Sequence, residues 1–393
     1  MKLTSMKLLM LAALVAGGLA APGTASAQIW AELEREVERG IRARTFPGAV
    51  VVVGRRDTIL HARGYGRVSW ARGAVTPSPD STLWDLASLT KVVATAGVAI
   101  RFVDRGVLDL DAPVARYLSS FSGGRRDQVT VRMLLDHTSG LRPWAPLFRE
   151  HRTREEAIGG VLAEAPRVTP GVASLYSDLN AILLGLVLER VGGAPLHLLA
   201  TTEVFVPLGL SDLMFEVPSG DRVRTAPSRL LADRTVVAGV VNDDNARRLG
   251  GAAGHAGLFG SGLALARFAQ AWLAEGAPRG ARWVGDSTIR RFLARSTPTG
   301  RRTLGWDTPD TTRPNTSYGA LRTPTVVGHT GWTGTSLWLD PKADLFVVLL
   351  TNRSISPRGN RTLDDILEVR AAVSDAARRA MAAVCAAEQP LGC

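Results

Sequence analysis

Hydrophobic runs rich in β-branched residues, separated by short polar turns, lie near both ends of the chain, which is the pattern of β-strands. Close to the N-terminus, the stretch "GAVVVVGRRDTILHARGYGRVS" predicts two strands around a polar turn at residues 55–57. Close to the C-terminus, "TVVGHTGWTGTSLWLDPKADLFVVLLTNR" predicts a hairpin, with two β-rich runs on either side of "DPKAD". Strand material at both ends predicts an α/β part that the two termini build together.

Hydrophobic residues outside these strands recur at helical spacing. We expect a helix before the first strand, over residues 30–46, and a closing helix over residues 362–384. The intervening chain is rich in predicted helices, which cover residues 88–106, 130–140, 177–193 and 261–276. The simplest topology is therefore one α/β part interrupted by a mostly helical part.

The first 27 residues have the pattern of a secretory signal peptide. Lys2 and Lys7 precede the apolar run "LLMLAALVAGGLAA", and "ASA" ends at Ala27, which gives a charged region, a hydrophobic region and a small-residue cleavage site in order. We expect cleavage after Ala27 and a secreted or periplasmic protein without a stable membrane span. An uncleaved anchor helix is the alternative, which the short, glycine-containing run disfavours.

Composition is that of a globular protein, with 46% hydrophobic and 21% charged residues. The formal net charge is +11, but the arginines are scattered and no basic patch interleaved with aromatic residues is present, so we expect no nucleic-acid partner. The two cysteines, Cys385 and Cys393, lie close to the C-terminus. They can close a small loop in an oxidising compartment or stay unpaired, and both alternatives remain open.

Lys91 stands out, because the chain contains only four lysines among its 47 basic residues. It follows Ser88 in "SLTK", at the start of an apolar helix, and residues three apart share a helix face. The helix dipole favours a developing alkoxide on Ser88. Burial lowers the pKa of a lysine, so that a neutral amine can take the serine's proton, which arginine cannot do. Alternatively, the SxxK spacing arises by chance and Lys91 extends to the surface.

Two further stretches carry residues for the same chemistry. Tyr176, in "LYSDLN", lies in a loop before a helix, where a phenol near a lysine can relay a proton to a leaving group. His329, in "GHTGWTG", opens a strand among glycines, where a substrate backbone can approach the strand edge and amides can stabilise an oxyanion. Taken alone, each stretch also fits a structural role, namely a packed tyrosine and a softened hairpin with a surface histidine.

The three motifs in this order resemble the serine penicillin-recognising superfamily. They are Ser-x-x-Lys at residues 88–91, a Tyr-x-Asn-like motif at 176–178 and His-Thr-Gly at 329–331. That superfamily includes class C β-lactamases, D,D-peptidases, D-aminopeptidases and family VIII esterases. The stretches "LLDHTSGL", "GGAAGHAGLF" and "LWLDPKADLFVVLLTNR" also look like segments of this group, so the resemblance covers almost all of residues 28–393.

The resemblance implies one catalytic unit with a β-lactamase/transpeptidase-like fold of the α/β (α+β) class. Its antiparallel sheet is flanked by helices, and the active site lies in the cleft between this part and a mostly helical domain. The α/β part then comprises approximately residues 28–84 and 300–393, and the helical part approximately residues 85–299. No metal or organic cofactor is implied.

The resemblance also implies a role for each motif residue. Ser88 is the acylated nucleophile, Lys91 is the base or part of it, and Tyr176 is a proton relay. The backbone amides of Ser88 and Trp332 form the oxyanion hole. The implied substrate-binding residues are Asp178, His329, Thr330 and Gly331.

Two positions depart from the pattern of the family. Asp178 stands where the family has asparagine, and an ionised carboxylate accepts hydrogen bonds but does not donate them. It can suit an amide N–H or an ammonium of the substrate, or cap the following helix, and Asn180 can serve in its place. His329 stands where many members have lysine, so the fixed positive charge is lost near neutral pH unless the histidine is protonated.

A glycine-rich loop around His255 is another candidate. His255, Asp243 and Asp244 could contact substrate, although a loop stabilised by its own turns explains the stretch as well. We do not predict a catalytic role for these three residues.

These residues predict a secreted serine hydrolase that forms an acyl-enzyme at Ser88. Peptides or amides of D-amino acids, as for D,D-peptidases, are the expected substrates, and a small molecule or a peptidoglycan-derived peptide is the expected partner. A carboxylesterase or a class C-like β-lactamase on the same scaffold is the alternative, with Trp332 or Trp144 lining an acyl pocket. A penicillin-binding envelope protein without turnover is a further alternative. The oligomeric state stays open.

Overall fold

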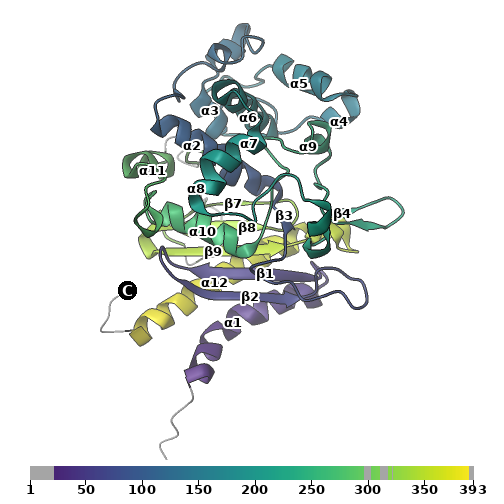
Figure 1. Ribbon diagram of the computed structural model, residues 1–393, viewed down its shortest axis with the longest axis vertical. Coiled ribbons are helices and arrows are strands. Elements are labelled where there is room, and N and C mark those ends of the chain that lie inside the picture. Colours follow the sequence, from purple (N-terminus) through teal and green to yellow (C-terminus); the bar gives the residue numbers. More distant parts are fainter. Residues whose placement is uncertain (1–21, 296–301, 310–316, 321, 389–393) are drawn as a thin grey trace, which may run out of the picture.

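A single antiparallel sheet of five strands forms the centre of the structure. The computed structural model describes residues 22–295, 302–309, 317–320 and 322–388. The sheet contains strands β1 (Gly48–Gly54), β2 (Ile59–Gly66), β7 (Val327–Thr330), β8 (Ser336–Asp340) and β9 (Leu345–Thr351). Their order is β2-β1-β9-β8-β7. Strands from both ends of the chain therefore lie side by side in one sheet, as the sequence predicts (Figure 1).

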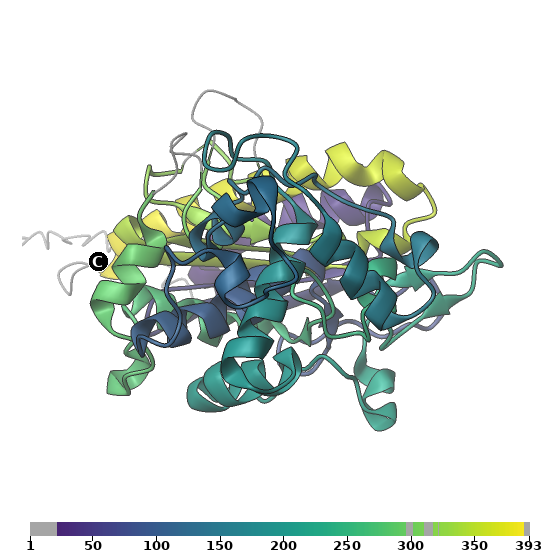
Figure 2. The ribbon, with the colours of Figure 1, turned by 90° about the horizontal axis from the view of Figure 1, so that it is seen from above.

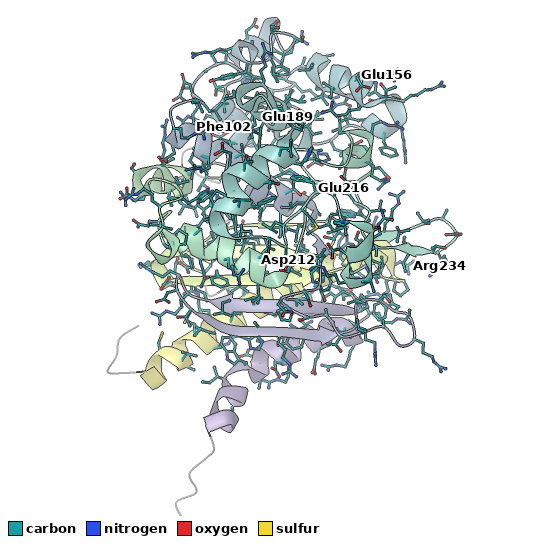
Figure 3. All side chains as sticks on the ribbon, in the orientation of Figure 1. Phe102, Glu156, Glu189, Asp212, Glu216 and Arg234 are labelled. Atoms are coloured by element: carbon teal, nitrogen blue, oxygen red, sulfur yellow. The ribbon has the colours of Figure 1, made fainter. Side chains whose placement is uncertain are left out.

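Helices form most of the remaining structure, together with several two-residue strands. The α-helices are α1 (Pro22–Arg42), α2 (Ala96–Asp104), α3 (Val131–Leu135), α4 (Leu147–Glu150), α5 (Arg154–Ala163), α6 (Asp178–Gly192), α7 (Leu196–Ala200), α8 (Val206–Leu208), α9 (Asp244–Arg248), α10 (Gly262–Leu273), α11 (Asp286–Leu293) and α12 (Leu363–Glu388). The short strands are β3 (Trp84–Asp85), β4 (Arg229–Leu230), β5 (Val236–Val237) and β6 (Phe259–Gly260). The β4–β5 hairpin projects from the body, with Arg234 near its tip (Figure 3).

The sheet is buried on both faces. Successive side chains of a strand point to opposite faces, so Val50 and Val52 of β1 join one hydrophobic core while Val51 and Val53 join a second. Helices α1 and α12 pack against each other and cover the second core (Figures 1 and 2). Helix α10 covers the other face, although its residues fall in the part that the sequence assigns to the helical domain. The domain boundaries stay a prediction.

The helix that carries the SxxK motif is irregular. The sequence predicts one buried helix over residues 88–106, whereas the structure has a 3₁₀ turn η1 (Ala87–Leu89), a π-helical turn η2 (Lys91–Thr95) and then α2. A π-turn adds a residue to the helix and often lies at a functional site. Within η2, the Thr95 hydroxyl donates a hydrogen bond to the carbonyl of Gly254 at 2.7 Å.

Other local expectations are largely confirmed. The polar turn at residues 55–57 separates β1 from β2, and α6 ends at Gly192 before Gly193 in the left-handed conformation. Helix α3 ends at Leu135 rather than at Gly140, so that boundary is wrong. Cys385 is disulfide-bonded, while Cys393 lies outside the described residues.

The N-terminal prediction concerns residues that the structure describes only in part. Residues 1–21 lie outside the described residues, and α1 begins at Pro22, before the expected cleavage site. Among the described residues no single helix is long and apolar enough to span a membrane, and only the bent pair Asp178–Gly192 and Leu196–Leu208 passes by length and composition. The signal peptide stays a prediction.

Candidate active site

Ser88 lies in the short η1 turn, directly after strand β3. The preceding residue, Ala87, has a φ of 48°, which is unfavourable for a residue with a Cβ. The Asp85 carboxylate accepts a hydrogen bond from the Ala87 amide at 2.9 Å and another from the Asn242 amide at 2.7 Å. Burial raises the pKa of Asp85 to about 6. Asp85 therefore joins the turn of the nucleophile to the loop at residue 242.

Lys91 is buried beneath Ser88, with 4% of its side chain exposed. Its Nζ donates hydrogen bonds to the Ser88 Oγ and to the His255 carbonyl, both at 3.0 Å. The same nitrogen lies 2.8 Å from Oδ1 of Asp178. The predicted contact between Ser88 and Lys91 is thus present, and the alternative that Lys91 extends to the surface is wrong.

The expected lowering of the Lys91 pKa is also wrong. Burial alone would lower it, but attraction to the Asp178 carboxylate and to Tyr176 outweighs burial and raises the pKa of Lys91 above its ordinary value. Lys91 is therefore an ammonium in the resting site. The decisive carboxylate comes from α6, far along the chain from Lys91, so local sequence predicts only the effect of burial.

Asp178 is the first residue of α6, and its carboxylate turns towards Lys91. Ser177 occupies the N-cap position of this helix, so the structure does not support a capping role for Asp178. Asn180 does not take its place either, because it is fully buried and bonded to the Ser139 hydroxyl at 2.5 Å and to Nδ1 of His137 at 3.2 Å.

Tyr176 lies over Lys91, with its ring centre 5.1 Å from Nζ. Burial raises the pKa of Tyr176, and the neighbouring positive charge and hydrogen bonds to Lys91 and Ser88 only partly oppose this effect. The phenol is therefore neutral in the resting site. It contacts both predicted partners, as a proton relay requires.

Three further side chains enclose Tyr176. The ring of His329 lies 5.7 Å from the Tyr176 ring and that of His137 lies 4.8 Å from it, while the Arg302 guanidinium lies 5.2 Å from the ring centre. Sequence reasoning gave no role to His137 or Arg302. No local motif marks them, because they reach Tyr176 from distant segments.

His329 is buried at the end of strand β7, with 4% exposed, so the alternative of a surface histidine is wrong. Burial, together with the positive charges of Lys91 and Arg302, holds the pKa of His329 well below its usual range. The histidine is therefore neutral near pH 7, and a fixed positive charge is absent at this position. Strand β7 is an edge strand of the sheet, as the proposed pairing with an extended substrate requires.

A tight turn at residues 331–335 follows β7. The Gly331 amide donates to the Thr335 carbonyl at 2.8 Å, and the Gly334 amide donates to the Gly331 carbonyl at 3.0 Å. The amide of Trp332 has no hydrogen-bond acceptor among the described residues. It is therefore available to an oxyanion, as the resemblance implies.

Two threonines connect this turn to the nucleophile. The Thr333 hydroxyl donates to the carbonyl of Asp85 at 2.8 Å, and the Thr335 hydroxyl donates to the carbonyl of Leu86 at 3.1 Å. Both acceptors lie just before Ser88 in the chain. The two amides of the predicted oxyanion hole are thus held by one hydrogen-bonded unit.

The site opens into one cleft with a volume of 910 Å³. Its lining includes every predicted site residue except Lys91, which lies below Ser88. The lining residues are Ser88, Trp144, Phe148, Arg149, Tyr176, Asp178, Asn242, Asp243, Asp244, Asn245, Arg302, Asp307, His329, Thr330, Gly331, Trp332, Arg353, Asn360, Leu363, Ile366 and Arg370. Trp144 and Trp332 are about half exposed at the cleft.

The glycine-rich loop contributes backbone and structure rather than a reacting side chain. His255 is buried, and its Nε2 lies 3.0 Å from Oδ1 of Asp243. Despite its burial, attraction to His255 and hydrogen bonds to it hold the pKa of Asp243 below its ordinary value. Within the described part of the chain, no group of three or more His, Cys, Asp or Glu side chains is placed to hold a metal ion.

Comparison of the sequence with models of protein families identifies the family of this chain. The model of the beta-lactamase family matches residues 33–371. The chain belongs to the beta-lactamase family. The resemblance recognised from the three motifs is thereby confirmed, and the chain is a beta-lactamase-family hydrolase.

Two relatives, from Escherichia coli and Bacillus subtilis, are similar to this chain over most of its length. A protein of Escherichia coli O157:H7, provisionally named a D-alanyl-D-alanine carboxypeptidase, is 27% identical over 366 residues, which cover 83% of this chain and 82% of that protein. N-acetylmuramyl-L-alanine amidase of Bacillus subtilis (strain 168) is 28% identical over 359 residues, which cover 83% of this chain and 81% of that protein.

Solved structures confirm the fold class. The hydrolase EstCE1, which has promiscuous acyltransferase activity, is similar with a TM-score of 0.71 and 22% identity over 89% of this chain and 100% of that chain. A class C beta-lactamase is similar with a TM-score of 0.70 and 18% identity, and the match covers 89% of this chain and 98% of that chain. The penicillin-binding protein homologue of Pyrococcus abyssi is similar with a TM-score of 0.66 and 22% identity, and the match covers 83% of this chain and 74% of that chain.

Proposed function

We propose that this beta-lactamase-family hydrolase acts through an acyl-enzyme at Ser88. The observation that carries the proposal is the contact of the Ser88 Oγ with the buried Lys91 Nζ at 3.0 Å, beside Tyr176 and at the edge of the cleft. A hydroxyl, an amine and a phenol in mutual contact are the parts that nucleophilic catalysis needs. The free amide of Trp332 supplies a donor for the oxyanion.

The ion pair of Lys91 and Asp178 defines the route of the proton. Lys91 is an ammonium at rest, so it accepts the serine's proton only as its own proton moves to Asp178. Attack then forms the bond between the Ser88 oxygen and the substrate's carbonyl carbon, and Tyr176 donates the proton that the leaving group takes as its bond breaks. In deacylation water takes the place of the leaving group, and the proton transfers run in reverse. Tyr176 takes the proton of the attacking water, Lys91 returns a proton to the Ser88 oxygen, Asp178 returns its proton to Lys91, and the acid is released.

Peptides or amides of D-amino acids are the substrates we propose. The name of one relative refers to D-alanyl-D-alanine, a peptide of a D-amino acid. Asp178 lines the cleft and uses one oxygen for Lys91, so its second oxygen can accept from an amide N–H or an ammonium of the substrate. Thr330 and Gly331 border the same cleft and contact the other end of the substrate.

A carboxylesterase is the second candidate function. The neutral His329 offers no fixed cation for a substrate carboxylate, and the half-exposed Trp144 and Trp332 offer apolar surface for an acyl group. A class C-like β-lactamase and a penicillin-binding protein without turnover are distinguished from both by the assays below.

Export belongs to the same proposal. The charged, apolar and small-residue regions that end at Ala27 favour a protein of the envelope compartment, where peptidoglycan peptides are available. The N-terminal sequence of the protein recovered from its native host tests this point, and a first residue of Gln28 is expected.

Intact-mass spectrometry after exposure to benzylpenicillin or p-nitrophenyl acetate tests the acyl-enzyme. The wild type should gain the mass of one acyl group, and Ser88→Ala should gain none, because the nucleophilic oxygen is absent. The matched control is Ser120→Ala, an exposed serine outside the cleft, which should label like the wild type. Labelling that persists in Ser88→Ala would exclude the proposal.

Relative turnover identifies the substrate class. Rates are measured for a D-alanyl-D-alanine peptide, a muramyl-L-alanine amide, short-chain p-nitrophenyl esters and a chromogenic cephalosporin. The proposal expects the highest kcat/KM on the D-alanyl-D-alanine peptide, and a preference for the muramyl-L-alanine amide would exclude D-amino-acid substrates. Preference for the esters favours the second candidate, and stable acylation by penicillin without turnover favours a binding protein.

A further inference from the structure

Two arginines are buried behind the 331–335 turn without an acidic partner. Arg353 is 1% exposed and Arg370 is 5% exposed, and both border the cleft. Among the described residues, no carboxylate forms an ion pair with either guanidinium, and burial lowers the pKa of both. A buried cation without a counter-ion is costly to stability, so this pair calls for a functional explanation.

Both guanidiniums bind backbone carbonyls of the turn. Arg370 extends from α12, and its Nη2 donates to the Gly331 carbonyl at 2.7 Å and to the Thr335 carbonyl at 2.9 Å. Arg353 follows β9, and its Nη2 and Nε donate to the Trp332 carbonyl at 2.6 Å and 3.2 Å. Its guanidinium carbon also lies 4.8 Å from the centre of the Trp332 ring.

The carbonyl of Gly331 and the amide of Trp332 belong to one peptide unit. Resonance couples the two groups, so a charged donor on the oxygen draws electron density away from the nitrogen. The N–H becomes a stronger donor, as hydrogen bonds in a chain polarise one another. Charge-assisted bonds produce the largest effect, and the burial of Arg370 protects this bond from screening by water.

We propose that Arg370 is a positioning residue that orients and polarises the Trp332 amide for the oxyanion of acyl transfer at Ser88. Arg353 holds the carbonyl on the other side of Trp332, so the two arginines fix both peptide planes that flank this residue. The negative charge that develops on the substrate oxygen then supplies the partner that both cations lack at rest. The inference rests on the proposed function, because it assumes acylation of Ser88.

Such a device acts on the transition state and not on the bound substrate. The ground-state carbonyl carries little charge, so a more polar N–H adds little to its binding, whereas the tetrahedral oxyanion carries a full charge. The proposal therefore separates two quantities. The rate of acylation depends on Arg370, and the affinity for unreacted substrate does not.

The experiment compares Arg370→Gln and Arg370→Lys with the wild type. Glutamine can donate to one carbonyl but carries no charge, while lysine keeps the charge. We expect Arg370→Gln to slow acylation by p-nitrophenyl acetate about 10-fold to 100-fold, below the loss of on the order of 10²–10³ for a whole oxyanion donor. Arg370→Lys should lose less, and the dissociation constant of unreacted substrate, taken from the concentration dependence of the acylation rate, should change little in both.

The affinity for phenylboronic acid is a second measurement. A purely structural role of Arg370 would not make this affinity follow the acylation rate. Ser88 Oγ adds to the trigonal boron as its proton leaves, and one boronate oxygen takes the oxyanion position. Its affinity should fall in proportion to the acylation rate across the variants. The matched control is Arg101→Gln, a partly buried arginine outside the cleft that also donates to a backbone carbonyl, that of Trp283.

The outcomes separate the two proposals. Acylation and boronate binding at wild-type level in Arg370→Gln would overturn this inference alone. A loss of affinity for unreacted substrate as large as the loss of acylation rate would also overturn it, because it indicates a merely structural role. If Arg370→Gln does not fold, Arg370→Met, an uncharged side chain of similar length, is compared in the same way. If the wild type shows no Ser88-dependent acylation, the proposed function fails and this inference fails with it.

Discussion

At the scale of single residues, the charge of Asp178 is one of two departures from the motifs that this chain resembles. Asp178 stands where the family has asparagine, and its carboxylate raises the pKa of Lys91 although burial lowers it. Replacing the carboxylate by a neutral amide removes the main opposition to burial, so Asp178→Asn should lower the pKa of Lys91. In Asp178→Asn, Lys91 is an ammonium only below this lower pKa. It therefore loses its proton at a lower pH than Lys91 of the wild type does.

Lysine NMR can measure this shift, because the chain has four lysines and two of them belong to the predicted signal peptide. A pH titration of ¹³C,¹⁵N-labelled lysine side chains follows Lys91, and Lys342→Arg assigns the remaining signal. Asp127→Asn removes an exposed carboxylate and should leave the titration unchanged. An unaltered or higher Lys91 pKa in Asp178→Asn would contradict the ion-pair assignment.

The residues of the site divide into those that local spacing predicts and those that it does not. Ser88 and Lys91 lie three residues apart, so helix geometry alone predicts their contact. The partners that set their chemistry come from other elements, and no spacing rule reaches them. Asp178 reverses the expected pKa shift of Lys91, and Arg302 adds a cation beside Tyr176.

At the scale of elements, the 331–335 turn depends on a close approach that only glycine permits. A Cβ on Gly331 would lie 2.2 Å from the Thr335 Oγ1, 2.6 Å from the Leu86 carbonyl and 3.2 Å from the Ala87 Cβ. Gly331→Ala must therefore displace the turn from the nucleophile and move the Trp332 amide. We expect acylation of Ser88 to slow on the order of 10²-fold, comparable to loss of an oxyanion donor.

Stopped-flow acylation by p-nitrophenyl acetate checks this prediction, with circular dichroism to confirm folding. The matched control is Gly159→Ala in α5, where an added Cβ meets nothing within 4 Å. Alanine is also the better helix former, so this variant should acylate normally. A folded Gly331→Ala protein that acylates at the rate of the control would refute the role given to the turn.

Elements with a strong period are predictable from the sequence, and irregular ones are not. The run of valines in β1 and the apolar pattern of α6 fit their observed bounds. The nucleophile helix is different, because its 3₁₀ and π turns depend on bonds such as that of Thr95 to Gly254. The strained Ala87 likewise depends on Asp85 and on segments that the sequence pattern does not connect.

At the scale of the whole molecule, the central sheet joins two hydrophobic cores. Strand β1 pairs with β2 from its own end of the chain and with β9 from the other end. Its valines point alternately into the core beneath α1 and α12 and into the core that extends to the helical part. The same strands therefore contribute side chains to both cores. Disruption of one core exposes one face of these strands and so weakens the support of the other core.

This coupling predicts that damage far from the cleft destabilises the entire protein. Leu33 of α1 is fully buried in the core beneath α1 and α12, and Leu33→Ala should lower the free energy of unfolding by about 2–5 kcal/mol. Urea unfolding with hydrogen exchange, read separately in α12 and in α6, should show both helices losing protection at the same lower urea concentration. Leu367→Ala, on α12 with 43% exposed, should change little. If α6 kept its wild-type midpoint in Leu33→Ala, the two cores would be independent units.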